Sequence, residues 1–169
     1  VTEYKLDWVL QPNGTRQFST NISTGNSESN SGKTEMENIE RSLSLTEDFN
    51  YGSLDGWKIV HGNWNIKNGI LVQSTNYYQG NLKGGTYALT GPSNWRNYSI
   101  SARVMSKDDD KIGFVFRYLD PNNYYILSWQ KQGNKMRFTK ILDGKEEGLA
   151  TTEIGYQQSK WYNLKVEVS

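Results

Sequence analysis

The sequence predicts an all-β protein in which two antiparallel sheets pack as a sandwich. Short segments of alternating apolar and polar residues recur at spacings of roughly 8–14 residues, and turn-forming residues separate them. No segment carries the apolar periodicity of a long helix. Aromatic residues make up 13% of the 169-residue chain, which has only 3 prolines. This composition favours a globular β protein over a disordered chain.

The first part of the chain is expected to form one strand and a polar linker. Apolar residues alternate with polar ones at Tyr4, Leu6, Trp8 and Leu10, before a turn at Pro12-Asn13-Gly14. Residues 1–18 are therefore interpreted as a strand from a preceding domain or an N-terminal extension. Residues 19–47 are interpreted as a Ser/Thr/Asn-rich linker, because such a composition buries too little apolar surface to order the chain. Within it, residues 39–46 fit a short helix or a strand equally well.

The compact domain is expected to span residues 48–169. Asn68-Gly69, between two apolar segments, is the strongest local signal for a β-hairpin. Strict alternation over residues 98–104 and 161–168 predicts two longer strands. The remaining strands are expected over residues 57–60, 64–66, 70–72, 86–89, 112–118, 123–129 and 136–141.

Alternation also predicts which side chains face the core. Phe114, Phe116 and Tyr118 are expected on one face of their strand. Arg117 is expected on the other face, where it points outward if the phenylalanines are buried. The core is also expected to contain Trp57 and Trp64.

Charge and composition exclude several classes of protein. The formal net charge is +1, and residues 49–169 carry fifteen basic against ten acidic side chains without any basic run. A nucleic-acid partner is therefore not expected. No window holds the ~18 consecutive apolar residues of a membrane span, so no membrane insertion is expected. The chain has no cysteine, which excludes disulfides and thiolate catalysis.

Several segments, in their order along the chain, carry a resemblance to a known family. They are Asp48-Phe49, Gly56-Trp57, Gly62-Asn63-Trp64, Asn68-Gly69-Ile70-Leu71, Trp95-Arg96-Asn97-Tyr98-Ser99-Ile100, residues 113–118 and Asn123-Tyr124-Tyr125. Together they resemble the concanavalin A-like lectin/glucanase (laminin G-like) domain. More narrowly, they resemble the bacterial carbohydrate-binding modules attached to glycosidases and surface adhesins. Residues 108–116 are also similar to the carboxy-terminal sandwich of thrombospondins.

The resemblance covers residues 48–169 and implies an antiparallel two-sheet jelly-roll sandwich, here preceded by the N-terminal strand and polar linker. The family pattern usually continues past Val168 with another hairpin and a closing strand, so the domain is expected to lack its closing strands. An open sheet edge invites a partner strand. Residues beyond Ser169 are the expected partner. The alternatives are the strand Tyr4–Leu10 and a neighbouring copy, which would give self-assembly.

No catalytic centre is predicted. Glucanases of this fold use two carboxylates on one central strand as nucleophile and acid. Residues 35–40 mimic the spacing of that motif, but they lie in the expected linker. His61 is the only imidazole, so neither a histidine-based triad nor a multi-histidine metal site can form. We therefore expect that the domain is not an enzyme.

Residue types suited to sugar recognition lie on two adjacent strands and in nearby loops. Proteins bind sugars with flat aromatic faces that stack on C–H groups and with planar polar groups that bond to hydroxyls. The candidate carbohydrate-binding residues are Tyr78, Trp95, Arg117, Asp120 and Tyr124. For each aromatic side chain taken singly, packing in the core is the alternative interpretation.

Two acidic segments are candidates for calcium, the only cofactor that the sequence suggests. Asp108, Asp109 and Asp110 bring three hard oxygen ligands together in a loop between strands, and a divalent cation would relieve their repulsion. A solvated loop tip, neutralised by flanking lysines, is the alternative that the sequence favours. Asp48 is the second candidate, because related modules often hold a structural calcium near the start of the sandwich.

These features together favour a non-catalytic carbohydrate-binding or adhesion module of a larger extracellular or cell-surface protein. Its partner would be a glycan or another surface protein. The alternatives are a structural β-sandwich subunit or domain of an extracellular assembly, and an accessory domain of a glycoside hydrolase. Candidate glycosylation sites, each at the start of an Asn-x-Ser/Thr triplet, are Asn13, Asn21 and Asn97.

Overall fold

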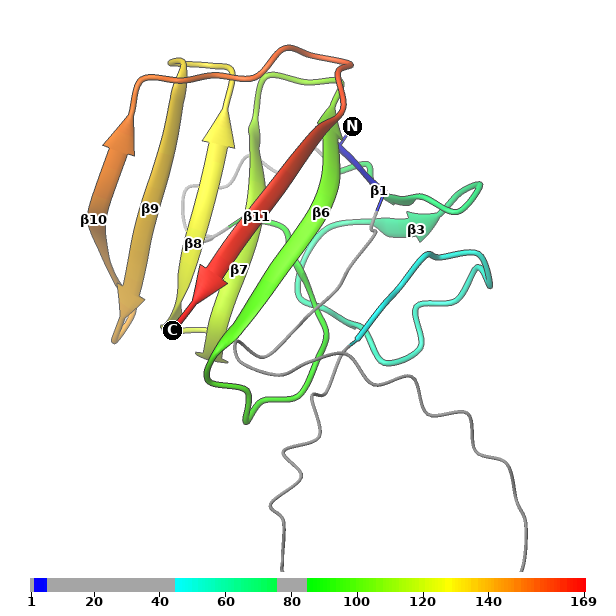
Figure 1. Cartoon of the computed structure of the whole chain (residues 1–169), viewed down its shortest axis with the longest axis horizontal. Helices are drawn as coiled ribbons and strands as arrows, with labels where there is room; N and C mark the ends of the chain where they lie inside the picture. The colour runs from blue at the N-terminus through cyan, green and yellow to red at the C-terminus, as the bar shows by residue number, and fades with distance from the viewer. Residues whose placement is uncertain (1, 6–44, 76–84) are drawn as a thin grey trace, which may run out of the picture.

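In the part of the chain that the structure describes, the regular structure consists of β-strands (Figure 1). The computed structural model describes residues 2–5, 45–75 and 85–169. Within these ranges no helix is long and apolar enough to cross a membrane. All strand pairings are antiparallel, so the predicted all-β, antiparallel fold class is confirmed.

The strands vary in length from 2 to 10 residues. In chain order they are β1 (Thr2–Lys5), β2 (Lys58–Ile59), β3 (Trp64–Ile66), β4 (Leu71–Gln73), β5 (Ala88–Leu89), β6 (Tyr98–Ser106), β7 (Lys111–Asp120), β8 (Asn123–Gln130), β9 (Lys135–Leu142), β10 (Lys145–Thr152) and β11 (Tyr162–Val168).

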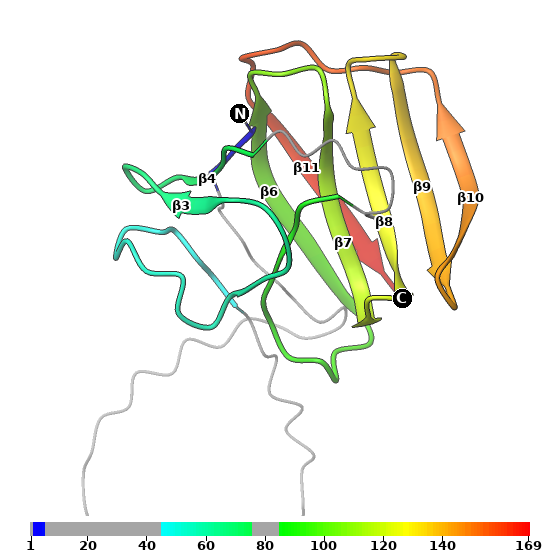
Figure 2. The same ribbon diagram turned by 180° about the vertical axis from the view of Figure 1, so that it is seen from behind.

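Two sheets pack face to face. One has the strand order β11-β6-β1-β4-β3 and the other the order β10-β9-β8-β7, while β2 and β5 form a short separate pair. β11 and β6 lie in front of β7 and β8 in Figure 1 and behind them in Figure 2, which separates the two layers. In both views β9 and β10 extend past β11.

The core fills the space between these layers. β6 buries Ile100, Ala102 and Val104, and β7 buries Phe114 and Phe116 against them. The larger of these side chains, those of isoleucine, valine and phenylalanine, each contribute about 1.5–3 kcal/mol through the hydrophobic effect once fully buried. The two tryptophans that the sequence assigned to the core, Trp57 and Trp64, are half-buried and pack against this cluster.

The N-terminal strand lies inside the five-stranded sheet. β1 pairs with β4 on one side, where Thr2 faces Gln73, and with β6 on the other, where Thr2 faces Ser106. The first strand is therefore part of the sandwich over Thr2–Lys5, while residues 6–44, which include most of the predicted linker and residues 35–40, lie outside the described residues. β11 pairs only with β6 among the described strands. That residues beyond Ser169 cover its other edge stays a prediction.

A β-bulge in β7 changes the face of the sheet on which its last side chains lie. The register between β7 and β8 shifts between Phe116 and Asp120, and Arg117 has a left-handed backbone, with φ 49°. The alternation therefore breaks after Phe116. Phe116 stacks with Tyr125 in the core, whereas Tyr118 packs against Tyr124 on the other face of the sheet. The prediction that Tyr118 shares a face with Phe116 was wrong, because alternation holds only while the ladder is regular.

Candidate functional site

An open groove of about 760 Å³ lies at one end of the sandwich. It is found where β6 and β8 begin and where β7 and β9 end, which is the lower end in Figure 1. The segments before β6 and around β2 form one wall, over residues 56–58 and 88–96. The ends of the four-stranded sheet form the other wall. A concave surface of this size matches the usual volume of a small-molecule site.

Aromatic rings make up much of the groove wall. Trp57 and Trp95 contribute from one side and Tyr118 from the other, and all three are half-buried. Trp95 packs on Tyr98, with ring centroids 6.1 Å apart. Its indole Nε1 is buried and has no acceptor among the described residues. A buried donor without a partner costs about 1–3 kcal/mol, so a ligand or water oxygen that reached it would gain a bond.

The β7 bulge positions Arg117 at the rim of the groove. The amide N–H of Arg117 donates to the hydroxyl of Tyr98 over 2.7 Å, and the exposed guanidinium donates from Nη2 to the carbonyl oxygen of Ser169 over 2.9 Å. Burial raises the pKa of the Tyr98 hydroxyl, although its bond to Arg117 acts in the opposite direction. Tyr98 therefore stays neutral and holds the bulge in place at ordinary pH.

Three tyrosines pack together on the outer face of the four-stranded sheet. The ring centroid of Tyr87 lies 6.0 Å from that of Tyr118 and 6.0 Å from that of Tyr124. The ring centroids of Tyr118 and Tyr124 lie 5.7 Å apart. Burial raises the pKa of both Tyr87 and Tyr124. Tyr124 is only 2% exposed, so it presents no ring face to a sugar. Tyr124 therefore supports the groove from beneath, and its part in sugar binding stays a prediction.

Asp120 does not line the groove. Its carboxylate accepts hydrogen bonds from the amide of Asn122 at 2.7 Å and from Nδ2 of Asn123 at 3.0 Å. Asn123 in turn accepts from the amide of Asp143 at 3.1 Å. The carboxylate therefore ties the β7–β8 turn to the β9–β10 turn, and a role for Asp120 in sugar binding stays a prediction. Of the predicted residues, Trp95, Arg117 and the largely buried Tyr124 border the groove, and Tyr78 lies outside the described residues.

Sequence reasoning missed the basic side chains that complete the groove. They are Lys58, Arg96 and Lys140. Each lies in a different segment, and no local pattern marks them as neighbours. Only the antiparallel packing, which brings the start of β6 next to the ends of β7 and β9, places them around one opening.

The predicted calcium ligands serve local hydrogen bonds. Oδ1 of Asp108 accepts from the amide of Asp109 at 2.9 Å, and the hydroxyl of Tyr156 faces the carbonyls of both Asp108 and Asp110. Burial, followed by the charges of Asp108 and Asp109, raises the pKa of the Asp110 carboxyl. The carboxylate of Asp48 accepts from the amide and side chain of Asn50.

In the described part of the chain, no three acidic or histidine side chains form a group that could hold a metal ion. Calcium binding therefore stays a prediction. Of the three sequons, Asn97 is exposed just before β6, and its glycosylation stays a prediction as well. Asn13 and Asn21 lie outside the described residues.

Comparison with known proteins agrees with the fold. The chain is similar to a solved structure described as carbohydrate binding module CBM66 from Bacillus subtilis, with a TM-score of 0.56 and 20% sequence identity. The match covers 68% of this chain and 68% of that chain. At this identity the similarity shows a shared β-sandwich fold and nothing finer. Models of protein families gave no match, and neither did curated proteins. The concanavalin A-like, laminin G-like assignment stays a prediction.

Proposed function

We propose that this chain is a non-catalytic carbohydrate-binding or adhesion module of a larger extracellular or cell-surface protein, and that the groove holds the glycan. The observation that carries this proposal is the wall of aromatic rings beside exposed planar donors, at the open end of a rigid sandwich. Trp95 offers a half-buried ring, and Arg117 offers an exposed guanidinium. Sugars need both kinds of contact, because their C–H faces stack and their hydroxyls bond directionally.

The similarity to a carbohydrate binding module supports the proposal only through the fold. One fold carries many functions, so the groove itself carries the argument. The described lining of the groove also contains no acidic side chain, so these residues offer no carboxylate pair of the kind that glycosidases use. Binding without cleavage is the chemistry that this set of side chains supports.

Pull-down with a panel of insoluble polysaccharides, followed by a glycan array, tests the proposal. Trp95→Ala is expected to abolish retention on the polysaccharide that binds the unchanged chain. Trp95→Phe, which keeps a ring against Tyr98 but removes the N–H, is expected to weaken retention less. Tyr51→Ala is the matched control, because Tyr51 is 95% exposed and lies outside the groove.

Melting curves of all three variants establish that they are folded, which is needed because Trp95 also packs against the core. Retention by a folded Trp95→Ala variant equal to that of the unchanged chain would place the glycan elsewhere. A panel in which no glycan binds would overturn the proposal.

A further inference from the structure

The lining of the groove carries charge of one sign. Among the described residues, four basic side chains contribute to it and no acidic side chain does. Lys58 comes from β2, Arg96 from the segment before β6, Arg117 from β7 and Lys140 from β9. The whole chain has a formal net charge of only +1. The basic lining is therefore a local feature of this surface and does not follow from a basic protein.

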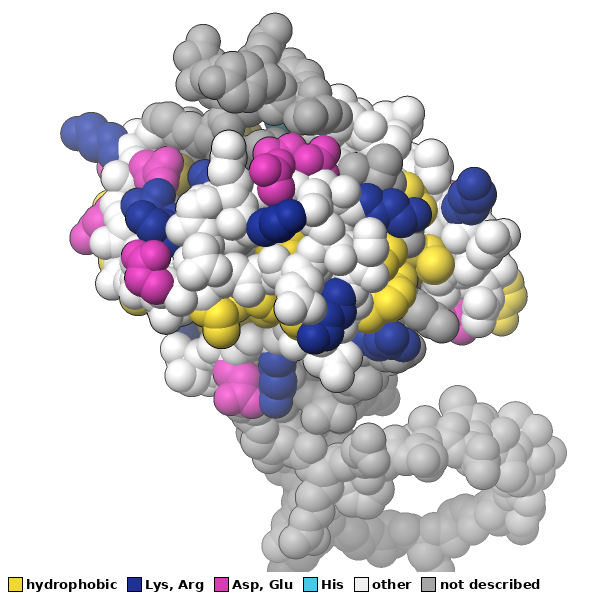
Figure 3. Space-filling model, turned by 90° about the horizontal axis from the view of Figure 1, so that it is seen from above, with side chains coloured by type: hydrophobic (Ala, Val, Ile, Leu, Met, Phe, Trp, Pro, Cys, Tyr) yellow, Lys and Arg dark blue, Asp and Glu magenta, His cyan; other side chains and the backbone are white. Residues whose placement is uncertain are grey.

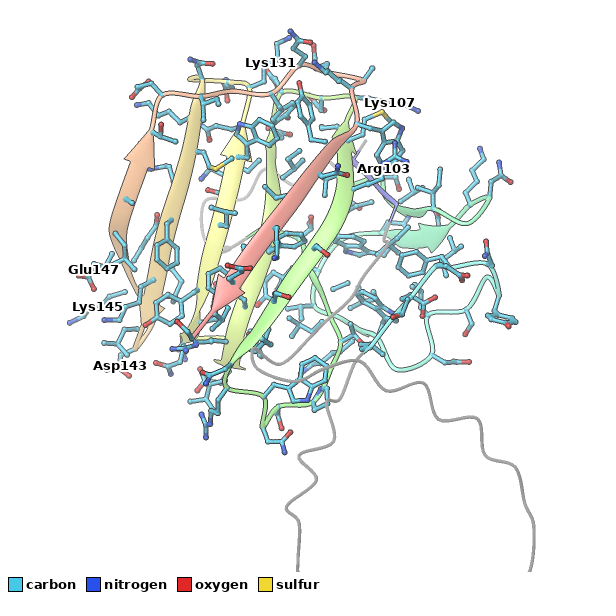
Figure 4. The ribbon with its side chains drawn as sticks, in the orientation of Figure 1. Arg103, Lys107, Lys131, Asp143, Lys145 and Glu147 are labelled. Atoms are coloured by element: carbon cyan, nitrogen blue, oxygen red, sulfur yellow. The ribbon has the colours of Figure 1, made fainter. Side chains whose placement is uncertain are left out.

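Charges on other surfaces are mixed. Figure 3 views the molecule from above, at the end opposite to the groove, and there basic and acidic side chains are interspersed. Along the β9–β10 turn, the labelled side chains Asp143, Lys145 and Glu147 alternate in sign (Figure 4). Opposite charges that lie close together weaken each other's field, whereas charges of one sign around a concave surface reinforce it.

Two of the four groove cations have no carboxylate partner within the described residues. They are Lys58 and Arg96, which are both exposed. Lys140 lies 3.3 Å from Glu147, in a pair that solvent reaches. Arg117 donates a hydrogen bond from its exposed guanidinium to the main-chain oxygen of Ser169. The groove thus presents positive charge that the described part of the chain only partly neutralises.

These observations point to the class of glycan. We infer that the groove binds an acidic polysaccharide whose sugars carry carboxylates, such as a polymer of uronic acids, and this inference rests on the proposed carbohydrate-binding function. A guanidinium matches a carboxylate with two parallel hydrogen bonds. The neighbouring ring of Trp95 provides the stacking surface for the sugar that carries the carboxylate. Charged and apolar contacts to successive sugars can then form together along the groove.

The probe is polygalacturonate, compared with the same polymer after full methyl esterification. The two share a backbone and differ in whether each sugar carries a charge. Isothermal titration calorimetry of the 169-residue chain is expected to show binding to polygalacturonate and at least about tenfold weaker binding to the ester. Raising the salt from 50 to 500 mM is expected to weaken the first interaction several-fold, because screening shortens the range of exposed charges.

Two substitutions locate the effect. Arg96→Gln is expected to weaken binding to polygalacturonate about fivefold, and its combination with Lys58→Gln more than that. Lys145→Gln is the matched control, because Lys145 is equally exposed but lies on β10, outside the groove. Its affinity is expected to equal that of the unchanged chain.

The outcomes separate this inference from the proposed function. Equal binding of the charged and esterified polymers, lost in Trp95→Ala but unchanged in Arg96→Gln, overturns the acidic ligand and leaves glycan binding in place. Binding to neutral glycans alone does the same. If neither polymer nor any other glycan binds, both the inference and the proposed function fall. Loss of binding in Lys145→Gln to the same extent as in Arg96→Gln would show general charge attraction and would also overturn the inference.

Discussion

Gly113 lies in the middle of β7, opposite Ser128 of β8, and its replacement tests the sheet that carries the groove. Its φ of 154° lies at the edge of the range that side chains avoid. A Cβ placed on it would lie 1.9 Å from the carbonyl oxygen of Leu127, more than 1 Å inside the 3.0 Å below which Cβ contacts are essentially not found. Because that oxygen belongs to the backbone, only separation of the two strands relieves the clash.

Gly113→Ala is expected to lower the free energy of unfolding by about 3 kcal/mol, from strain of the backbone and from forced separation of packed strands. For a domain of this size, that corresponds to a melting temperature about 10 °C lower. Chemical denaturation and differential scanning fluorimetry measure both quantities. Gly148→Ala on β10 is the control, since a Cβ there meets nothing within 4 Å. If Gly113→Ala melted within about 2 °C of the unchanged chain, the pairing of β7 with β8 at this position would be refuted.

Three further predictions concern Tyr156 and the two acidic segments. Tyr156 is 3% exposed, and its hydroxyl faces the Asp108 and Asp110 carbonyls. Tyr156→Phe should therefore lower the free energy of unfolding, measured in urea, by about 1–2 kcal/mol. An unchanged free energy would mean that water replaces these hydrogen bonds. The pKa of Asp110 is raised in the folded state, so ionisation disfavours folding as pH rises through that pKa. Asp110→Asn should therefore raise the melting temperature at pH 7 and have no effect well below pH ~3.9, and a lower melting temperature at pH 7 would contradict this. Any rise in melting temperature on adding calcium should disappear in Asp110→Asn or Asp48→Asn. A melting temperature that changes with neither calcium nor chelator would show that the carboxylates of both acidic segments are solvated and bind no calcium.

The fold could be predicted where backbone requirements and side-chain alternation leave a clear sequence pattern. Asn68-Gly69 predicted a hairpin, and both residues have the positive φ that its turn requires, 55° and 67°. β6 alternates and is buried on its inner face. β10 was not predicted, because all of its residues are exposed and its sequence shows no apolar period. The turn at Asp143-Gly144 was the one local signal for it.

The candidate site was less accessible from sequence. Trp95 and Arg117 were proposed as carbohydrate-binding residues because their chemistry suits sugars, and both line the groove; that they bind a sugar stays a prediction. Asp120 and Tyr124 were assigned with them because their residue types also suit sugars. In the structure, the carboxylate of Asp120 accepts hydrogen bonds within its turn, and Tyr124 is buried. The bulge that reverses Tyr118 depends on register between strands, which residue patterns within one strand do not encode.

The indole N–H of Trp95 gives the most direct test of the central claim, because it is buried at the groove wall without an acceptor in the described part of the chain. The sequence has 6 tryptophans, so a nitrogen–proton correlation spectrum of the labelled chain shows few indole signals, and Trp95→Phe assigns the one of interest. On titration with the glycan that binds, the Trp95 indole signal and the amide of Arg117 are expected to shift together. The amides of β10 are expected to stay in place. Binding accompanied by an unmoved Trp95 signal, with the shifts gathered on another face, would contradict the claim that this groove is the binding site.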